Sequence, residues 1–198
     1  PGWSSVMPLR RLLVDQAAIR KGAIAPRVSE ALAFAEGLNA SGAAYFKQNP
    51  SLSGRLDKMK GMQREYLAHE YFNADWTPFY FADVAAELAE AKLSFICSAH
   101  LLDHIDALNF TAEQQALLAG IDDPVRRQGL RDYIINQQFR RDLFVKGDVP
   151  LSVPEARALW SGYRFALSAS REDISLKATG ALGEADLQAE VYVPILDI

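Results

Sequence analysis

The sequence has a single cysteine, Cys97, so no disulfide can form within the chain. A lone thiol is usually a small buried apolar residue, and no redox motif surrounds this one. No apolar run approaches the roughly 20 residues needed to cross a bilayer, and the N-terminus lacks the basic-then-apolar pattern of a secretory signal. These absences predict a soluble, cytoplasmic protein.

The sequence also lacks an excess of positive charge, because 21 Lys and Arg residues face 25 Asp and Glu residues, for a net charge of −4. Such a balance gives no electrostatic footprint for polyphosphate and disfavours non-specific nucleic-acid binding. A glycine-rich phosphate loop is absent as well, since 180–183 is a turn between predicted strands. With 198 residues, 49% of them hydrophobic, the chain can form one or two domains with a sizeable core.

Apolar residues at helical spacing dominate the first three quarters of the chain. They predict helices over 9–22, 26–48, 62–72, 77–91, 99–108, 111–119 and 124–139. The segment 93–97 is rich in residues that favour strands and predicts one strand. The segment 49–61 is basic and poorly patterned, so we expect no helix there. We expect Thr77 and Thr111 to cap their helices, with Pro78 at the first helical position.

The pattern changes after Gly147. A short helix is predicted over 153–160, and period-two alternation predicts antiparallel strands over 163–168, 174–178 and 187–193. The predicted fold class is therefore mainly α (α+β), a helical body followed by a smaller helix-plus-strand tail. We expect three parts: a junction over 1–8, a helical domain over 9–147, and a tail over 148–198 that could be an incomplete winged helix.

The segment 64–83 contains seven aromatic residues among titratable groups. Aromatic rings and carboxylates together can bind a cationic side chain through ion pairing and cation–π attraction. The candidate binding residues are Tyr66, His69, Glu70, Asp75, Trp76, Tyr80 and Asp83. A buried polar network, in which His69 and Glu70 tie their helix to the following turn, is an equally good interpretation of the same residues.

Two other patterns suggest different chemistry. His100, Asp103 and His104 would share one face of a helix and could bind a metal ion in a stand-alone enzyme, although the general-base glutamate of a zincin helix is missing. The one basic concentration could instead belong to a winged-helix regulator that binds DNA, but a solvated face paired with Asp132 and Asp142 is the simpler interpretation. That concentration comprises Arg126, Arg127, Arg131, Arg140, Arg141 and Lys146.

A family resemblance separates these alternatives. It is carried by Tyr66-Leu-Ala-His-Glu-Tyr-Phe-Asn-Ala-Asp-Trp-Thr-Pro-Phe-Tyr-Phe-Ala-Asp83, together with 91–99 and 140–147. These stretches resemble the predicted regulatory domain of bacterial S-adenosylmethionine-dependent methyltransferases. In that family the domain follows a Rossmann-like methyltransferase domain, and some members resemble protein-lysine methyltransferases that act on outer-membrane proteins.

The resemblance implies an accessory module without catalytic, cofactor-binding or metal-binding residues of its own. S-adenosylmethionine would be bound by the parent enzyme, and the partners would be the N-terminal methyltransferase domain of that enzyme and a protein substrate. The chain begins Pro1-Gly2-Trp3 without an initiator methionine and ends in the apolar segment 194–198. We therefore expect it to be a piece of a longer polypeptide and to be inactive alone.

Overall fold

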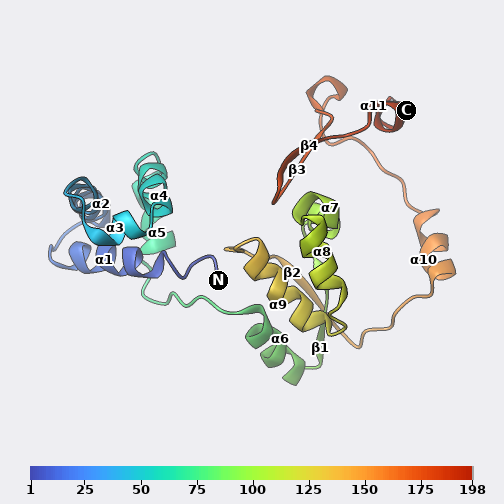
Figure 1. Cartoon of the computed structure of the whole chain (residues 1–198), viewed down its shortest axis with the longest axis horizontal. Helices are drawn as coiled ribbons and strands as arrows, with labels where there is room; N and C mark the ends of the chain where they lie inside the picture. The colour runs from blue at the N-terminus through green and yellow to red at the C-terminus, as the bar shows by residue number, and fades with distance from the viewer. Residues whose placement is uncertain (198) are drawn as a thin grey trace. The chain divides into compact units, whose positions relative to one another are not determined.

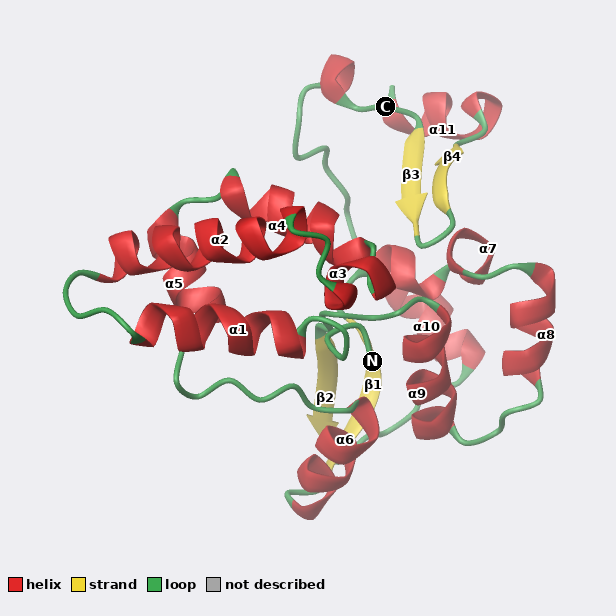
Figure 2. Cartoon of the chain, turned by 60° about the vertical axis from the view of Figure 1, so that its left-hand side comes forward, coloured by secondary structure: helices red, strands yellow, loops and turns green. Residues whose placement is uncertain are grey.

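The structure, a computed structural model, describes residues 1–197 of the chain (Figure 1). These residues form eleven α-helices and two separate antiparallel pairs of strands, shown in yellow in Figure 2. The prediction of a mainly α fold with a few strands is confirmed. The chain divides into two compact units, residues 1–79 and residues 80–198. The predicted boundary near Gly147 stays a prediction.

Residues 1–79 contain five helices. They are α1 (Met7–Ala18), α2 (Ile24–Ala40), α3 (Ala44–Gln48), α4 (Ser51–Lys60) and α5 (Arg64–Tyr71). The predicted helix over 9–22 is α1, which ends earlier because Arg27 of α2 donates a hydrogen bond from Nε to the carbonyl of Ala17 at 2.7 Å. This bond satisfies a carbonyl of the last turn, where no further backbone donor follows.

Two further predictions in this unit were wrong. The helix predicted over 26–48 is broken into α2 and α3, because Gly42 adopts φ +76°, a left-handed conformation that stops a helix. The segment 49–61, expected to be irregular, is the helix α4. Its Leu52, Leu56 and Met59 follow helical spacing and are fully buried, so packing decided a helix that the basic composition obscured.

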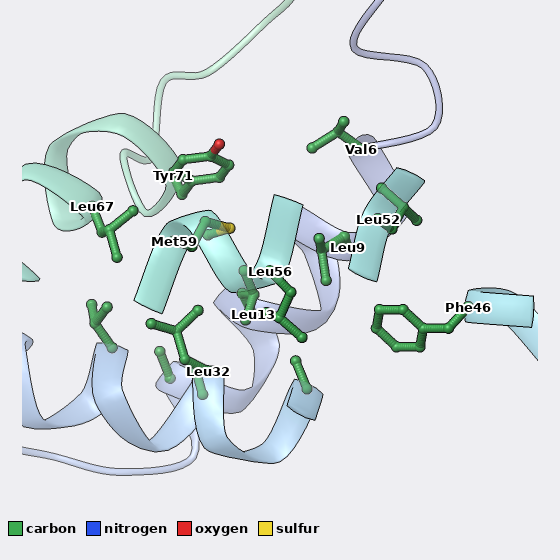
Figure 3. Packing of buried hydrophobic residues seen from close by; sticks show 14 residues of the cluster. Val6, Leu9, Leu13, Leu32, Phe46, Leu52, Leu56, Met59, Leu67 and Tyr71 are labelled. Carbon is green, nitrogen blue, oxygen red and sulfur yellow. The ribbon is translucent and has the colours of Figure 1, made fainter. Parts of the chain in front are cut away.

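The core of residues 1–79 is one continuous apolar cluster (Figure 3). Residues one turn apart on each helix face inward, and Figure 3 shows side chains of α1, α2, α4 and α5 meeting around Leu56. The cluster consists of Val6, Leu9, Leu13, Ala17, Val28, Ala31, Leu32, Ala35, Phe46, Leu52, Leu56, Met59, Leu67 and Tyr71. Burial of this apolar surface is the main source of stability for the unit.

Residues 80–198 contain the remaining elements. They are α6 (Phe81–Glu90), β1 (Leu93–Ser98), the 3₁₀ helix η1 (Leu101–His104), α7 (Asp106–Asn109), α8 (Ala112–Ala119), α9 (Pro124–Ile134), β2 (Asp142–Lys146), α10 (Val153–Trp160), the 3₁₀ helix η2 (Arg171–Asp173), β3 (Lys177–Gly180), β4 (Gly183–Asp186) and α11 (Ala189–Leu196). The predicted strand over 93–97 is confirmed as β1. Its partner β2 was not predicted, and the two pair with a register shift between Phe95 and Cys97.

Helix α6 begins at Phe81, three residues after Pro78, so the predicted start at Thr77 and Pro78 was wrong. Tyr80 is extended and provides no side-chain cap. The start is set by packing, because the Phe81 ring lies edge-on to Phe95 of β1 at 4.9 Å and near Phe144 of β2 at 6.4 Å. The helix packs its apolar side inward, with Phe81 and Ala85 buried.

Two helix boundaries in the middle of the chain differ from prediction. The helix expected over 99–108 is a 3₁₀ turn, η1, followed by the single turn α7. The helix expected over 124–139 stops at Ile134, because Asn136 adopts φ +51°, a conformation that Asn tolerates better than most residues. Helix α8 matches its prediction and carries the full capping box between Thr111 and Gln114.

The tail contains one confirmed helix, one strand prediction confirmed in part and two that were wrong. The predicted strand over 174–178 overlaps β3, which begins at Lys177. Helix α10 has a capping box between Ser152 and Glu155, and no residue of it is buried. The segment 163–168 has no strand partner among residues 1–197, and 187–193, whose alternation predicted a strand, forms most of α11. Short apolar runs are compatible with either state, so the period alone did not decide. No helix in the described part of the chain is long and apolar enough to span a bilayer.

The expected turn over 180–183 is confirmed as the tip of the β3–β4 hairpin, which lies beside α7 in both Figure 1 and Figure 2. The Leu182 N–H donates to the carbonyl of Leu108, and the Ala181 N–H donates to Asn109 Oδ1, both at 3.1 Å. A Cβ at Gly180 would lie 2.2 Å from that Leu108 carbonyl oxygen. Only glycine therefore allows this approach.

Candidate functional site

The candidate residues of 64–83 fall into both units. Tyr66, His69 and Glu70 lie on α5, and Asp75 and Trp76 lie in the segment after it. Tyr80 and Asp83 belong to residues 80–198, where Tyr80 precedes α6 and Asp83 lies in its first turn. The candidates of each unit are therefore treated as a group of their own, the α5 group and the α6 group, and their role in binding stays a prediction.

Trp76 is already engaged inside residues 1–79. The guanidinium of Arg10 lies over the Trp76 ring, 4.5 Å from its centroid, and donates from Nη2 to the carbonyl of Asn73. Trp3 meets the Trp76 ring edge-on at 5.0 Å, and the same Trp3 ring also contacts Tyr71 at 5.9 Å. The cation–π position on Trp76 is thus occupied by a residue of the chain itself, which fastens the 73–76 segment to α1.

The α5 group is more accessible. Tyr66 is 52% exposed and His69 is exposed, one turn further along the same helix. Among the described residues, the side chains of His69 and Glu70 form no hydrogen bond or ion pair. The polar network that would link α5 to the following turn is therefore not observed. Instead, Asn73 Oδ1 accepts a hydrogen bond from the Asp75 N–H at 3.1 Å.

The α6 group forms an exposed aromatic and acidic face. Tyr80 is 51% exposed, and Asp83 and Glu87 lie on the solvent side of α6, one helical turn apart, away from the buried Phe81 and Ala85. Within the described residues neither carboxylate forms an ion pair. In residues 80–198, Tyr80 and Asp83 thus place an accessible ring and an accessible charge on the same helix end.

The proposed metal ligands have other partners. His104 Nε2 donates to the carbonyl of Ser98 at 2.8 Å, which fixes its tautomer, and Asp103 accepts from the Ser98 hydroxyl at 2.7 Å. Arg131, 6% exposed, pairs with Asp103 at 3.1 Å. No group of three or more His, Cys, Asp or Glu side chains in residues 1–197 is placed to hold a metal ion. The helix that would have aligned these three residues is absent here, so the metal interpretation was wrong.

Burial raises the pKa of Asp103, but the hydrogen bond from Ser98 and the positive charge of Arg131 outweigh it, so that the pKa of this carboxyl lies below its usual value. His100 Nδ1 lies 3.3 Å from the same carboxylate. Asp103 is thus an ionised group that joins β1, η1 and α9. Its role is structural.

Of the six basic residues, Arg127, Arg131 and Arg140 form ion pairs within the unit. Arg127 donates to Asp106 at 2.9 Å, and Arg131 pairs with Asp103. The predicted solvated face paired with Asp132 and Asp142 was therefore wrong for these two side chains, because their partners differ and Arg131 is buried. The three-stranded sheet that the winged-helix interpretation needed is also absent from the described residues.

Arg140 is the basic residue that pairs with the predicted Asp132 and Asp142, and its contacts with Gln128 and Phe81 were not predicted. Its guanidinium bonds both oxygens of Asp142 at 2.7 and 2.8 Å, Gln128 at 2.9 Å, and Asp132. It also lies 4.1 Å from the centroid of the Phe81 ring. Burial lowers the pKa of Arg140, but the bonds to Asp142 and Asp132 outweigh this and raise it, so the side chain stays charged. The available signal was the Arg140-Arg141-Asp142 sequence, which places a carboxylate two residues after Arg140.

Residues 63–146 match the family described as the predicted methyltransferase regulatory domain. This segment belongs to that family. The regulatory domain spans α5 to β2 and therefore includes both groups of candidate residues, as well as the Arg140 and Asp103 networks. The match agrees with the resemblance seen in the sequence and concerns residues 63–146 of the chain.

Two relatives extend the comparison beyond the regulatory domain. The chain is 44% identical over 197 residues to an uncharacterized protein, sll1526, of Synechocystis, and spans 39% of the length of that protein. The fold is similar to that of PKMT2 from Rickettsia typhi, with a TM-score of 0.56 and 18% identity, over 76% of this chain and 28% of that one. Both relatives are much longer than this chain. At 18% identity the second likeness concerns the fold.

Proposed function

We propose that this chain is a non-catalytic accessory module of an S-adenosylmethionine-dependent methyltransferase and that it recognises the protein substrate, with lysine as the methyl acceptor. The observation that carries the proposal is the exposed face of α6 inside the regulatory domain, where Tyr80 and Asp83 are accessible. In this proposal S-adenosylmethionine is bound by a neighbouring methyltransferase domain of the longer parent protein, in the cytoplasm.

The chemistry of the α6 face suits a cationic side chain. An ammonium group between a carboxylate and a tyrosine ring gains a charge-assisted hydrogen bond and a cation–π contact, which together are worth about 1–2 kcal/mol at an exposed site. The Asp83 carboxylate lies in the first turn of α6 and has no ion-pair partner among the described residues. Trp76 does not contribute in this proposal, because Arg10 already occupies its ring.

The test is methyl transfer by the full-length parent protein to a lysine-containing protein substrate. We expect Tyr80→Ala and Asp83→Asn each to raise KM about 5- to 10-fold with little change in kcat, because binding is lost equally in the ground and transition states. Glu113→Gln is the matched control, since it also removes an exposed carboxylate from the first turn of a helix, α8, in the same unit.

An unchanged KM in both variants would overturn substrate recognition by α6. A kcat loss of the same size as the loss in kcat/KM would point instead to an effect on the catalytic domain. The purified 198-residue chain should bind the substrate weakly and transfer no methyl group. Turnover by the chain alone, retained after rigorous purification, would contradict the accessory role.

A further inference from the structure

A cleft of about 360 Å³ lies within residues 80–198. One wall is formed by η1 and α7, a second by the segment that follows α9, and a third by the turn of the β3–β4 hairpin. The volume is at the small end of the roughly 300–1,000 Å³ typical of ligand sites, enough for a group of one or two residues. This cleft is separate from the α6 face.

The walls of the cleft are fixed by the fold. Asn109 donates from Nδ2 to the carbonyls of Leu102 and Ile105 at 2.8 and 3.0 Å, while its Oδ1 accepts from Ala181. One 4% exposed amide therefore joins the η1–α7 wall to the hairpin wall. Gly180 permits the close approach of the same hairpin to Leu108. A cleft with preformed walls loses little entropy when it binds a ligand.

The cleft carries no uncompensated charge. Asp103 is its one ionisable carboxylate, and this group is already paired with Arg131 and hydrogen-bonded by Ser98. The Arg131 guanidinium lies over the Phe110 ring at 5.5 Å and does not line the cleft. An anionic ligand would find no free cation here, and a cationic ligand would compete with Arg131 for Asp103. The ligand should therefore be uncharged.

The polar groups that line the cleft include the His100 ring, the Asn136 amide and the Thr179 hydroxyl. In the tautomer with Nδ1 of His100 donating toward Asp103, Nε2 is an acceptor, whereas the amide and the hydroxyl can both donate and accept. Beside them lie apolar surfaces of Ile135 and of Phe139, whose side chain is 68% exposed.

We propose that this cleft binds an uncharged segment of polypeptide through one backbone amide and one apolar side chain. A peptide N–H would donate to His100 Nε2, a peptide carbonyl would accept from Asn136, and the side chain would cover the Phe139 ring. A secondary amide next to an aliphatic or aromatic group is the ligand chemistry that matches this set of donors, acceptors and apolar surface.

The test uses the full 198-residue chain and N-acetyl-leucine methylamide as the probe, followed by ¹H–¹⁵N correlation spectra. We expect saturable shifts of the signals of His100, Asn136, Phe139 and Thr179 at millimolar probe. The lysine and aspartate analogues of the probe should bind more weakly, and so should isoamyl alcohol, which has a similar apolar group but no amide.

Two variants probe the contacts with little risk to the fold. Asn136→Gly deletes the amide while retaining the left-handed backbone, and Phe139→Ala removes an exposed ring. Each should weaken probe binding roughly five-fold, the loss expected for one hydrogen bond or one apolar contact. Tyr133→Ala, which removes an equally exposed ring from α9 outside the cleft, should leave binding unchanged.

The proposal fails if no saturable shifts appear at tens of millimolar probe, if the lysine or aspartate analogue binds as tightly as the leucine probe, or if both cleft variants bind normally. Binding of isoamyl alcohol as tight as that of the leucine probe would also overturn it, because the amide would then play no part. The readout is binding alone, so it is independent of methyl transfer and of the α6 proposal.

Discussion

The interior of residues 1–79 is apolar, whereas that of residues 80–198 is built around buried polar groups. All fourteen residues of the apolar cluster belong to the first unit, while only five buried apolar residues lie in the second. The four buried polar residues, Ser98, Asn109, Arg131 and Asp132, are all in the second unit. Apolar packing tolerates many arrangements, but a buried ionic network is stable only when every partner is in place.

The polar interior of residues 80–198 lies next to the surfaces that we propose to bind partners. The cleft, the α6 face and most of the segment that matches the regulatory domain lie in the unit with the polar interior. Directional bonds fix positions more closely than apolar contacts, which suits an element that must present groups to a partner. We therefore expect the two units to respond differently to salt, pH and truncation of single side chains.

The largest effect should come from the apolar unit. Leu13 is fully buried, and Leu13→Ala should lower the free energy of unfolding by about 3–4 kcal/mol, since both transfer energy and cavity formation contribute. Urea unfolding followed by circular dichroism measures this loss. It should be nearly the same at low and high salt. A loss of stability that varied strongly with salt would contradict the view that apolar packing alone stabilises residues 1–79.

The second effect should come from the Arg140 network. Arg140→Met leaves Asp132 and Asp142 without their partner and should destabilise residues 80–198 by about 2–4 kcal/mol near neutral pH. The deficit should shrink as pH falls, because burial raises the pKa of Asp132 and the variant lacks the Arg140 charge that opposes this rise. Unfolding of the variant across pH checks this. A deficit equal at pH 3 and pH 7 would assign the role of Arg140 to packing on Phe81 instead.

The third effect concerns Asp103 and acid stability. Because its pKa is lowered in the folded state, the stability it contributes is fully present above its unfolded pKa of about 4 and is lost as pH falls through the folded value. Asp103→Asn should cost about 1 kcal/mol at pH 7 and less as pH falls. Stability curves of both proteins between pH 2 and 7 should therefore converge. Parallel curves would contradict the lowered pKa.

The smallest effect compares two capping boxes in different surroundings. Thr111→Ala should cost about 1 kcal/mol of unfolding free energy, because α8 packs its Leu118 into the unit. Ser152→Ala removes the same motif from α10, which buries no residue. It should reduce helix content without measurable loss of global stability. Equal losses in the two variants would show that α10 contributes to the folded unit as much as α8 does.

The sequence by itself determined the elements whose information is local. The capping boxes at Thr111 and Ser152, the inward stripe of α6 and the tight turn over 180–183 depend on residues a few positions apart, and the structure has each of them. The family was also readable, because its motif is a continuous stretch within 63–146. For the candidate site, the sequence supplied the residue types of the α6 face.

Tertiary structure decided what depends on distant partners. Helix α4 needed the apolar cluster, β2 needed β1 about 45 residues earlier, and 163–168 remained without a strand partner among residues 1–197. The Trp76 ring is covered by Arg10, and His104 Nε2 is hydrogen-bonded to the carbonyl of Ser98, so neither side chain is free for the role that the sequence suggested. The physical reason is the same in each case: periodicity specifies which face of an element is apolar, but not which group in the folded chain will cover it.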